Sequence, residues 1–573
     1  MASRMSIRLP ADQQALLDSL AKQATDERWA ARLFERDTSL WTDDPEVAET
    51  IAERLGWLDA PAHFALQAAA LEGFGDGAIE AGFDTAVVMG MGGSSLAPDI
   101  LHRTFGTIEG YLALRILDST DPAAVAATVD DLDPLETLWI VASKSGTTTE
   151  PLAFMADAWA RVEAALEARG SDQRPGEFFA VITDPGKSLA AIPHNEDLRE
   201  RFLNPPDIGG RYSALTYVGL VPASLIGIDV DALLDAGGQM LEGCRAPEAT
   251  LNPGLHLGLA IGSLAKAGRD KLTFLADPAI SSFGAWAEQL LAESTGKHGT
   301  GIVPVDLEPV RDVDAYGADR AFVDLSLAGD EAGAGEARAA RQALLGRLEA
   351  AGHPVIRIEL DDPIDLAGEA IRWEVATAFA GAVLGIDPFD QPNVEEAKEL
   401  TRQVLAGHAD EAGEKPDESD SGAIFLRAHD EASLAEVLRP TLRALEVPRY
   451  LAIQAFIAPS AAVDERIAAI RAALASTGCA TTAGYGPRFL HSTGQLHKGG
   501  PATGVFLQLT ADHPVDRQIP GWPYTFGRLI DAQARGDREA LRAHDRPVVQ
   551  VHLGDDLADD LAILERAVRR ALS

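Results

Sequence analysis

The sequence contains little cysteine and no long hydrophobic run, and each scarcity excludes a class of protein. Two cysteines, Cys244 and Cys479, in 573 residues are too few for a disulfide framework or a cysteine-rich metal site. They fit a reducing compartment, and the first residues, MASRMSIRLPADQQ, lack the apolar core of a signal peptide. We therefore expect a cytoplasmic protein. The longest nearly apolar run, residues 215–228, is interrupted by Pro222 and is too short to cross a bilayer.

Basic residues are scarce relative to acidic ones. The chain has 49 lysines and arginines against 88 acidic residues, which gives a formal net charge of -39. Binding to nucleic acid or to an anionic membrane surface needs clustered positive charge, so we expect neither partner. Only nine of the 49 basic residues are lysines, so the position of each lysine is informative.

The first 75 residues are expected to form a helical segment. The stretches DERWAARLFERDTSLW and DPEVAETIAERLGWL repeat apolar residues every three or four positions. Asp44 followed by Pro45 is typical of a helix N-cap and first turn.

From about residue 84, short β-rich runs alternate with helical patterns. Continuous apolar strands separated by amphipathic helices are typical of an α/β fold with mainly parallel sheets. The expected strands are TAVVMGMGG, LRILDS, TLWIVAS, FFAVITD, KLTFLAD, GIVPVD, AFVDLSL, PVIRIEL, YLAIQAFIA and GVFLQLT. We predict two doubly wound units, in residues 76–235 and 236–515. An acidic loop at 407–422 interrupts the second unit, and residues 516–573 are expected to serve packing.

One loop gathers an unusual number of hydroxyl groups. In VASKSGTTTEP, five of the seven residues from Ser143 to Thr149 carry a hydroxyl. The loop joins a predicted buried strand to an amphipathic helix, and ligands of open α/β sheets bind at such a junction. Free backbone N–H groups and the helix dipole favour an anion there. A helix N-cap would explain one or two of these hydroxyls; five of them favour a phosphate site.

A second turn, MGMGGSSLAP at residues 89–98, also follows an apolar strand. Ser95 replaces the third glycine of a dinucleotide fingerprint, and the lysine of a P-loop is absent. Gly92 and Gly93 allow a ligand to approach the backbone closely. Two phosphate-type turns without a nucleotide signature indicate a small phosphorylated metabolite.

Further motifs carry a resemblance to a known family. The pair GMGGSS and SKSGTTTE resembles the phosphosugar-binding SIS domain, so the two predicted units would be SIS domains. Four segments are similar to signatures of the glucose-6-phosphate isomerase family: IGGRYSALTYVGLVPASLIGID (208–229), FGAWAEQLLAESTGK (283–297), GIDPFDQPNVEEAK (385–398) and LHSTGQLHKGG (490–500). The terminal stretches resemble the isomerase half of transaldolase–isomerase fusions.

The resemblance implies a reaction and its catalytic residues. The family interconverts glucose 6-phosphate and fructose 6-phosphate by ring opening and C1–C2 proton transfer through a cis-enediolate. It uses no metal and no cofactor. The motifs imply Glu293 as the base and Arg211 as the cation that stabilises the enediolate. They imply Lys398 and His491 as the ring-opening pair. Outside these motifs, such an acid would be read as a surface residue and such a histidine as structural.

The resemblance also implies the residues that hold the hexose phosphate. They are Gly93, Ser94, Ser143, Lys144, Ser145 and Thr148 around the phosphate, with Gly210, Gln289 and Gln391 nearer the sugar. Four of the nine lysines, Lys144, Lys297, Lys398 and Lys498, fall within the motifs.

The order of the catalytic residues differs from that of the common family. There the order is Glu, His, Lys, whereas here it is Glu293, Lys398, His491. His497, in the same segment as His491, is a second candidate. In the common family the neighbouring subunit lends the histidine, which implies a homodimer. A relocated histidine from the same chain leaves a monomer open.

Other functions remain open at this level. An isomerase with additional mannose 6-phosphate activity has the same motifs. A non-catalytic SIS-domain sensor of sugar phosphates would keep the hydroxyl loops without needing Glu293, Arg211 and Lys398. A relative that makes glucosamine phosphate needs an N-terminal cysteine, and residues 1–75 contain none. The sequence contains no HExxH motif, so it lacks this signature of a metal site.

Overall fold

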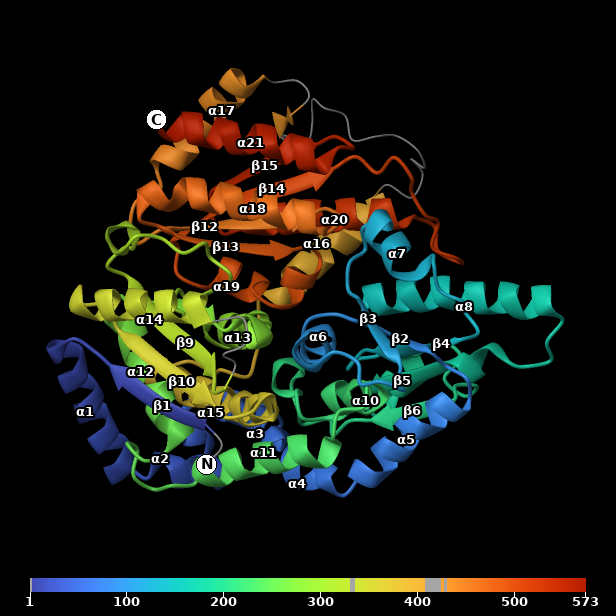
Figure 1. The fold of residues 1–573 in the computed structure, drawn as a ribbon, viewed down its shortest axis with the longest axis horizontal. Coiled ribbons are helices and arrows are strands. Elements are labelled where there is room, and N and C mark those ends of the chain that lie inside the picture. Colours follow the sequence, from blue (N-terminus) through green and yellow to red (C-terminus); the bar gives the residue numbers. More distant parts are fainter. Residues whose placement is uncertain (1–2, 330–334, 408–423, 427–429) are drawn as a thin grey trace.

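Three five-stranded sheets with helices packed against them organise the chain in the computed structural model (Figure 1). The structure describes residues 3–329, 335–407, 424–426 and 430–573. The acidic loop predicted at 407–422 lies outside the described residues, apart from Gly407. The α/β class is confirmed, and all ten expected strands are present. Within the described ranges, no helix is long and apolar enough to cross a membrane.

The first sheet is entirely parallel, with the order β3-β2-β4-β5-β6. Its strands are β2 (Thr85–Gly90), β3 (Ala113–Leu117), β4 (Thr137–Ala142), β5 (Phe179–Thr183) and β6 (Glu200–Leu203). Its helices are α5 (Ala68–Glu80), α6 (Gly93–Phe105), α7 (Pro122–Val129), α8 (Thr149–Arg169), α9 (Lys187–Ala191) and α10 (Tyr217–Leu225). Every residue of β2 and β4 is buried, as expected for central strands covered on both faces.

The second sheet has the order β1-β10-β9-β7-β8. Its strands are β1 (Ser3–Arg8), β7 (Lys271–Ala276), β8 (Val303–Val305), β9 (Arg320–Leu327) and β10 (Val355–Leu360). Its helices are α11 (Val230–Gly243), α12 (Pro253–Lys266), α13 (Phe283–Thr295), α14 (Gly335–Ala350) and α15 (Leu366–Leu384).

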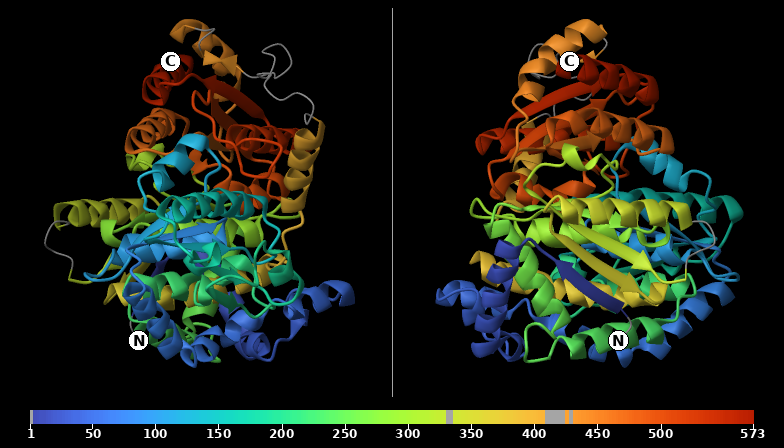
Figure 2. Two further views of the ribbon diagram at one scale, coloured as in Figure 1. Left: turned by 90° about the vertical axis from the view of Figure 1, so that its right-hand side faces the viewer. Right: turned by 60° about the vertical axis from the view of Figure 1, so that its left-hand side comes forward.

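The expectation that residues 1–75 are wholly helical is wrong at the start of the chain. Strand β1 pairs antiparallel with β10, from Ser3 opposite Leu360 to Arg8 opposite Val355 (Figure 2). The strand alternates exposed and more buried side chains, as an edge strand does. Helices α1 (Ala11–Asp26), α2 (Trp29–Phe34), α3 (Pro45–Ala52) and α4 (Ala60–Ala65) follow. The predicted cap is confirmed, since the Asp44 carboxylate accepts the Glu46 N–H at 2.9 Å.

The prediction of two sheets is also wrong, because the later strands form a third one. Its order is β11-β15-β14-β12-β13, and all its pairs are parallel. Its strands are β11 (Ile424–Phe425), β12 (Tyr450–Phe456), β13 (Ala480–Tyr485), β14 (Gly504–Ala511) and β15 (Val548–Leu553). Residues 516–573 therefore do more than pack, since they supply β15. Buried apolar strands show that a sheet exists, but their sequence does not show which strands pair.

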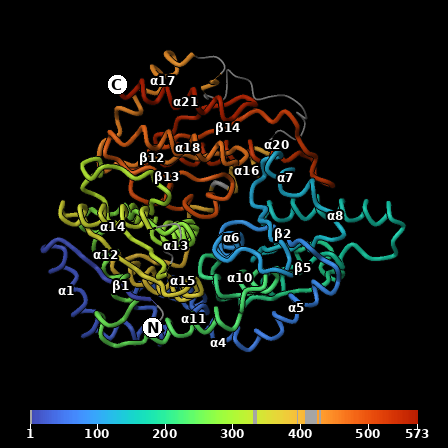
Figure 3. Tube along the Cα trace, in the orientation of Figure 1, coloured from blue at the N-terminus to red at the C-terminus, as the bar shows by residue number. Residues whose placement is uncertain are grey.

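The third sheet and its helices lie on one side of the other two sheets, at the top of the view in Figure 3. Its helices are α16 (Val394–Gly407), α17 (Glu431–Arg443), α18 (Ala461–Ala473), α19 (Gly494–Gly499), α20 (Phe526–Ala543) and α21 (Leu557–Leu572). Arg471 of α18 donates hydrogen bonds to the carbonyls of Asp306 and Leu307, just after β8, at 2.8 and 2.9 Å. Helix α16 packs against α20, so the segment that carries Lys398 is held by the third sheet.

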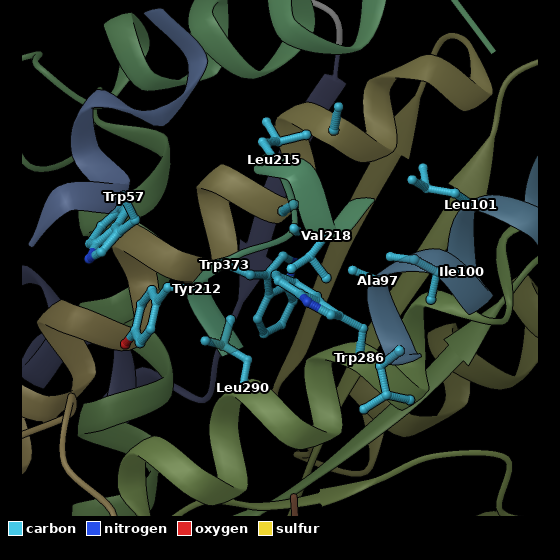
Figure 4. Close-up of a cluster of buried hydrophobic side chains, with 14 of the residues drawn as sticks. Trp57, Ala97, Ile100, Leu101, Tyr212, Leu215, Val218, Trp286, Leu290 and Trp373 are labelled. Atoms are coloured by element: carbon cyan, nitrogen blue, oxygen red, sulfur yellow. The ribbon is translucent and has the colours of Figure 1, made fainter. Parts of the chain in front are cut away.

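A continuous apolar core supports the loops of the first two sheets (Figure 4). Trp286 and Leu290 of α13 lie in the same cluster as Ile100 of α6. The Tyr212 ring stacks on Trp57, with ring centroids 5.2 Å apart. This packing fixes α13 and the turn around Tyr212, and both elements also carry polar residues that face a cavity.

His513 joins the third sheet to the first and makes the stability of the protein depend on pH. It lies between Asp121, the N-cap of α7, and Asp531 of α20, at 3.6 and 3.4 Å. Burial acts to lower the pKa of His513, but Asp531, Asp121 and Asp516 raise it overall above 6.5. The stabilisation is therefore fully present below the ordinary histidine pKa and is lost as pH rises through the raised pKa.

We expect the melting temperature of the parent to fall more steeply across this window than that of His513→Gln. Thermal unfolding measured at intervals from about pH 5.5 to 8.5 checks this difference. His63→Gln, at an exposed histidine, is the matched control and should follow the parent. Parallel curves for the parent and His513→Gln would contradict the assignment.

Candidate active site

The sequence-predicted site residues all line one cavity of about 610 Å³, where the three sheets meet. These residues are Gly93, Ser94, Ser143, Lys144, Ser145, Thr148, Gly210, Arg211, Gln289, Glu293, Gln391, Lys398 and His491. They come from loops and helices at the carboxyl ends of strands and from α16. Residues that are far apart in sequence therefore face one space large enough for a small metabolite.

Helix α13 presents a carboxylate and an amide to the cavity. Gln289 and Glu293 are four residues apart, so both lie on one face of the helix, and Trp286 and Leu290 occupy the core face. The Gln289 amide donates to the Glu293 carboxylate at 3.2 Å and to the His491 carbonyl at 2.8 Å. Glu293 is only 7% exposed, so its carboxylate is held in a water-poor position.

Arg211 lies beside Glu293 in the wall of the cavity. Its Nη1 lies 3.4 Å from Glu293 Oε1, and the arginine is 3% exposed. The guanidinium also donates to Ser294 Oγ at 2.7 Å and to Gln391 Oε1 at 2.9 Å. Two backbone carbonyls, of Pro388 and Asp390, accept from Nη2. All these partners fix the guanidinium plane beside the buried Glu293 carboxylate.

Close backbone contact brings the glycine turn to Arg211. A Cβ on Gly93 would lie 2.1 Å from the Gly210 carbonyl oxygen, so only glycine allows this approach. The neighbouring Gly92 has φ of +56°, and a Cβ there would lie 2.6 Å from the His491 carbonyl oxygen. The glycines predicted to allow close approach of a ligand thus also allow close approach of other backbone segments.

The hydroxyl loop is tied together by its own side chains. Ser143 Oγ donates to Thr148 Oγ1 at 3.1 Å, and the Thr147 hydroxyl donates to Ser145 Oγ at 3.0 Å. Thr148 is the N-cap residue of α8, but its hydroxyl makes no capping bond. The hydroxyls are therefore not explained by helix capping. Gly146, at φ +67°, turns the loop against the Ser188 carbonyl.

Lys144 lines the cavity, and its ammonium already has two protein partners. It pairs with Asp184 and donates to the Pro206 carbonyl at 2.9 Å. Burial raises the pKa of Asp184, although Lys144 acts to lower it. Binding of a phosphate by this lysine would therefore compete with an existing ion pair.

Glu150 is a site residue that the sequence reasoning missed. It is in the first turn of α8, is 5% exposed, and its Oε1 lies 3.1 Å from His491 Nε2. Burial acts to raise the pKa of Glu150, but His491 and Lys398 lower it overall. The signal was in the motif SKSGTTTE, where an acid follows the hydroxyls. The partner of this acid, His491, is 341 residues away in sequence.

Comparison with known proteins finds a matching family model and similar relatives. A family model described as phosphoglucose isomerase matches residues 31–302. A probable glucose-6-phosphate isomerase of Haloarcula marismortui is 32% identical over 57% of this chain and 79% of its own length. The glucose-6-phosphate isomerase of Rubrobacter xylanophilus is 33% identical over 55% and 81%.

The chain belongs to the phosphoglucose isomerase family. A hypothetical protein of Thermus thermophilus is similar in structure, with a TM-score of 0.56 and 26% identity over 70% of this chain and all of its own. A glucose-6-phosphate isomerase of Chlamydia trachomatis shares the fold, with a TM-score of 0.53 and 21% identity over 71% of this chain and 89% of its own. The resemblance to transaldolase–isomerase fusions stays a prediction.

The second histidine candidate of the family motif, His497, is excluded from the cavity. It is buried in α19, where its Nδ1 lies 3.3 Å from Gln454 Nε2 and its ring packs on Phe489 and Phe506. Burial lowers the pKa of His497 well below 6.5. His491 lies on the preceding turn of the same segment and faces the cavity instead.

The C-terminal stretch supplies a wall of the site in this family member. Tyr524, Leu529 and Gln533 line the cavity, although residues 516–573 were expected to serve packing alone. The Gln533 amide donates to Glu150 Oε1 at 2.7 Å. Sequence reasoning missed these residues because helix α20 shows only an amphipathic pattern, and its polar face is buried by contacts between sheets.

Proposed function

We propose that this chain interconverts glucose 6-phosphate and fructose 6-phosphate. The observation that carries the proposal is the buried Glu293–Arg211 pair, at 3.4 Å, in the same cavity as the hydroxyl loop. A carboxylate base beside a fixed cation is what proton transfer through an enediolate requires. Family membership and relatives named glucose-6-phosphate isomerases support the same reaction.

The phosphate is assigned to the loop between β4 and α8. The hydroxyls of Ser143, Ser145 and Thr148 and the first backbone N–H groups of α8 offer donors without a second buried charge. Ser94 and Gly93, in the other turn, complete this end of the site. A phosphate held here takes no part in bond breaking, so its binding energy orients the reacting carbons.

Ring opening is assigned to His491 and Lys398. Together they move a proton from the anomeric hydroxyl to the ring oxygen, which breaks the ring bond and forms the open-chain sugar. Glu293 then removes the proton from C2 of the aldose, the hydroxyl proton on O2 passes to O1, and Glu293 returns its proton to C1, while Arg211 stabilises the negative oxygen of the enediolate. The reverse direction uses the same groups. All these steps use only side chains of the chain itself.

The position of His491 bears on the subunit question. His491 of this chain faces its own cavity, so the site described does not require a histidine from a neighbour. The homodimer stays a prediction, as does a cytoplasmic location. An isomerase of this kind would serve glycolysis and gluconeogenesis.

A coupled assay tests the proposal. Purified protein receives fructose 6-phosphate in the presence of EDTA, and a dehydrogenase reports the glucose 6-phosphate that forms. We expect turnover, whereas binding of fructose 6-phosphate without turnover would favour a sugar-phosphate sensor instead. Mannose 6-phosphate, offered under the same conditions, tests the broader specificity.

The phosphate assignment makes a separate prediction. Ser145→Ala should lower kcat/KM for fructose 6-phosphate by about tenfold, since a hydrogen bond to a charged group contributes about 1.5 kcal/mol or more. Ser171→Ala is the control, because Ser171 is a loop serine that does not line the cavity. An unchanged kcat/KM in Ser145→Ala would argue against this loop as the phosphate site.

A further inference from the structure

A network of four hydrogen-bonded side chains ends at His491. Its members come from the first and the third sheet. The Thr120 hydroxyl donates to Gln533 Oε1 at 2.7 Å, and Gln533 Nε2 donates to Glu150 Oε1 at 2.7 Å. The same carboxylate oxygen lies 3.1 Å from His491 Nε2. Thr120 precedes helix α7 and Glu150 is in the first turn of α8, both packed on the first sheet, whereas Gln533 and His491 come from the third.

The donors and acceptors along this network have a single consistent direction. A threonine hydroxyl that donates to Oε1 leaves only the NH₂ group of Gln533 to face Glu150. An ionised carboxylate is an acceptor only, so His491 must donate its Nε2–H to it. Nδ1 of His491 is then the ring nitrogen that exchanges a proton. The reverse amide orientation would place two acceptors against each other.

Burial makes each hydrogen bond of this network costly to lose. Thr120, Gln533 and Glu150 are 0%, 3% and 5% exposed, so water does not replace a lost partner at low cost. Two further polar groups act electrostatically with Glu150: Lys398 lowers its pKa, and the carboxylate itself acts to raise the pKa of Tyr524. Gln533 and His491 both form hydrogen bonds with Glu150 Oε1.

We propose that Gln533, oriented by Thr120, is a positioning residue for ring opening. It holds the Glu150 carboxylate where His491 donates Nε2–H to it and keeps Nδ1 for the substrate. Helix α20 of the third sheet thereby completes the site, so a histidine displaced along the sequence acts in the geometry the reaction needs. This inference rests on the proposed isomerase function.

The test compares variants of the full chain. Gln533→Met keeps the length of the side chain without its amide, and we expect kcat to fall by about ten- to a hundredfold with KM little changed, as for lost positioning of a general acid–base group. Thr120→Val should show a smaller loss, and Thr120→Ser should restore the parent rate. Gln550→Met, which removes an amide from β15 outside the cavity, is the matched control.

A second variant gives a readout that a merely structural role would not produce. In Gln533→Glu, the new carboxyl donates to Glu150 only while it is protonated. Its kcat should therefore approach that of the parent at the acid end of the pH profile and fall progressively as pH rises. Gln533→Met should be reduced at every pH.

The results separate this proposal from the function on which it rests. If the parent isomerises fructose 6-phosphate but the Gln533 and Thr120 variants keep its kcat and pH profile, the positioning role is wrong. If the parent does not isomerise, the proposed function fails, and ¹⁵N shifts of the His491 ring decide the positioning role. Ring shifts that differ between parent and Gln533→Met would support it, and identical shifts would overturn it.

Discussion

Replacing Glu293 with glutamine is expected to lower kcat by about a thousandfold or more. The amide has the shape of the carboxylate but cannot take a proton from C2, so the chemical step loses its base. Arg211 keeps its bonds to Ser294, Gln391 and two carbonyls, so the cavity should remain formed and KM should change little. The coupled assay with fructose 6-phosphate measures both constants.

A second glutamate of helix α13 provides the control for Glu293. Glu288 does not line the cavity, and burial raises its pKa well above 4.5, so glutamine there replaces a carboxyl outside the site. We expect Glu288→Gln to retain the parent kcat. A Glu293→Gln protein with kcat within about tenfold of the parent would refute the assignment of the base.

Replacing Arg211 with lysine should lower kcat/KM by about a hundred- to a thousandfold. One ammonium group cannot reproduce the planar set of bonds to Ser294, Gln391 and the Pro388 and Asp390 carbonyls. The developing oxyanion then loses its fixed cation. The substitution should also lower the denaturant midpoint, because buried carbonyls lose their donor.

Chemical rescue separates the electrostatic role of Arg211 from a loss of folding. Added guanidinium at millimolar concentration should restore part of the activity of Arg211→Ala, whereas ammonium at the same concentration should restore less. Steady-state assays with each cation, at constant ionic strength, measure the difference. Equal rescue by both cations, or a fully active Arg211→Lys, would contradict the role proposed for the guanidinium.

The arrangement of the site explains how the altered order of the motifs is compatible with one active site. His491 and Gln533 come from the third sheet, Glu150 from the first, and Glu293 from the second. Each residue is carried by a helix or turn packed on its own sheet. The order along the sequence therefore matters less than how the sheets pack, and Arg471 is one of the buried contacts that set this packing.

The sequence by itself determined the local features of this protein. Continuous apolar runs specified the ten expected strands, because a strand buried on both faces has no polar side to display. Asp44 and Pro45 specified a helix start through a bond between near neighbours. The family motifs also singled out residues that share a cavity, including Glu293 and Arg211. In each case the information lies within one short segment.

Only the tertiary structure decided what depends on partners distant in sequence. It assigned the later strands to a third sheet, paired β1 with β10, and excluded His497 from the site. It also revealed Glu150 and Gln533, whose hydrogen bonds span 341 and 383 residues. Strand pairing and side-chain hydrogen bonds form wherever complementary surfaces meet, and those surfaces exist only once the sheets have packed together.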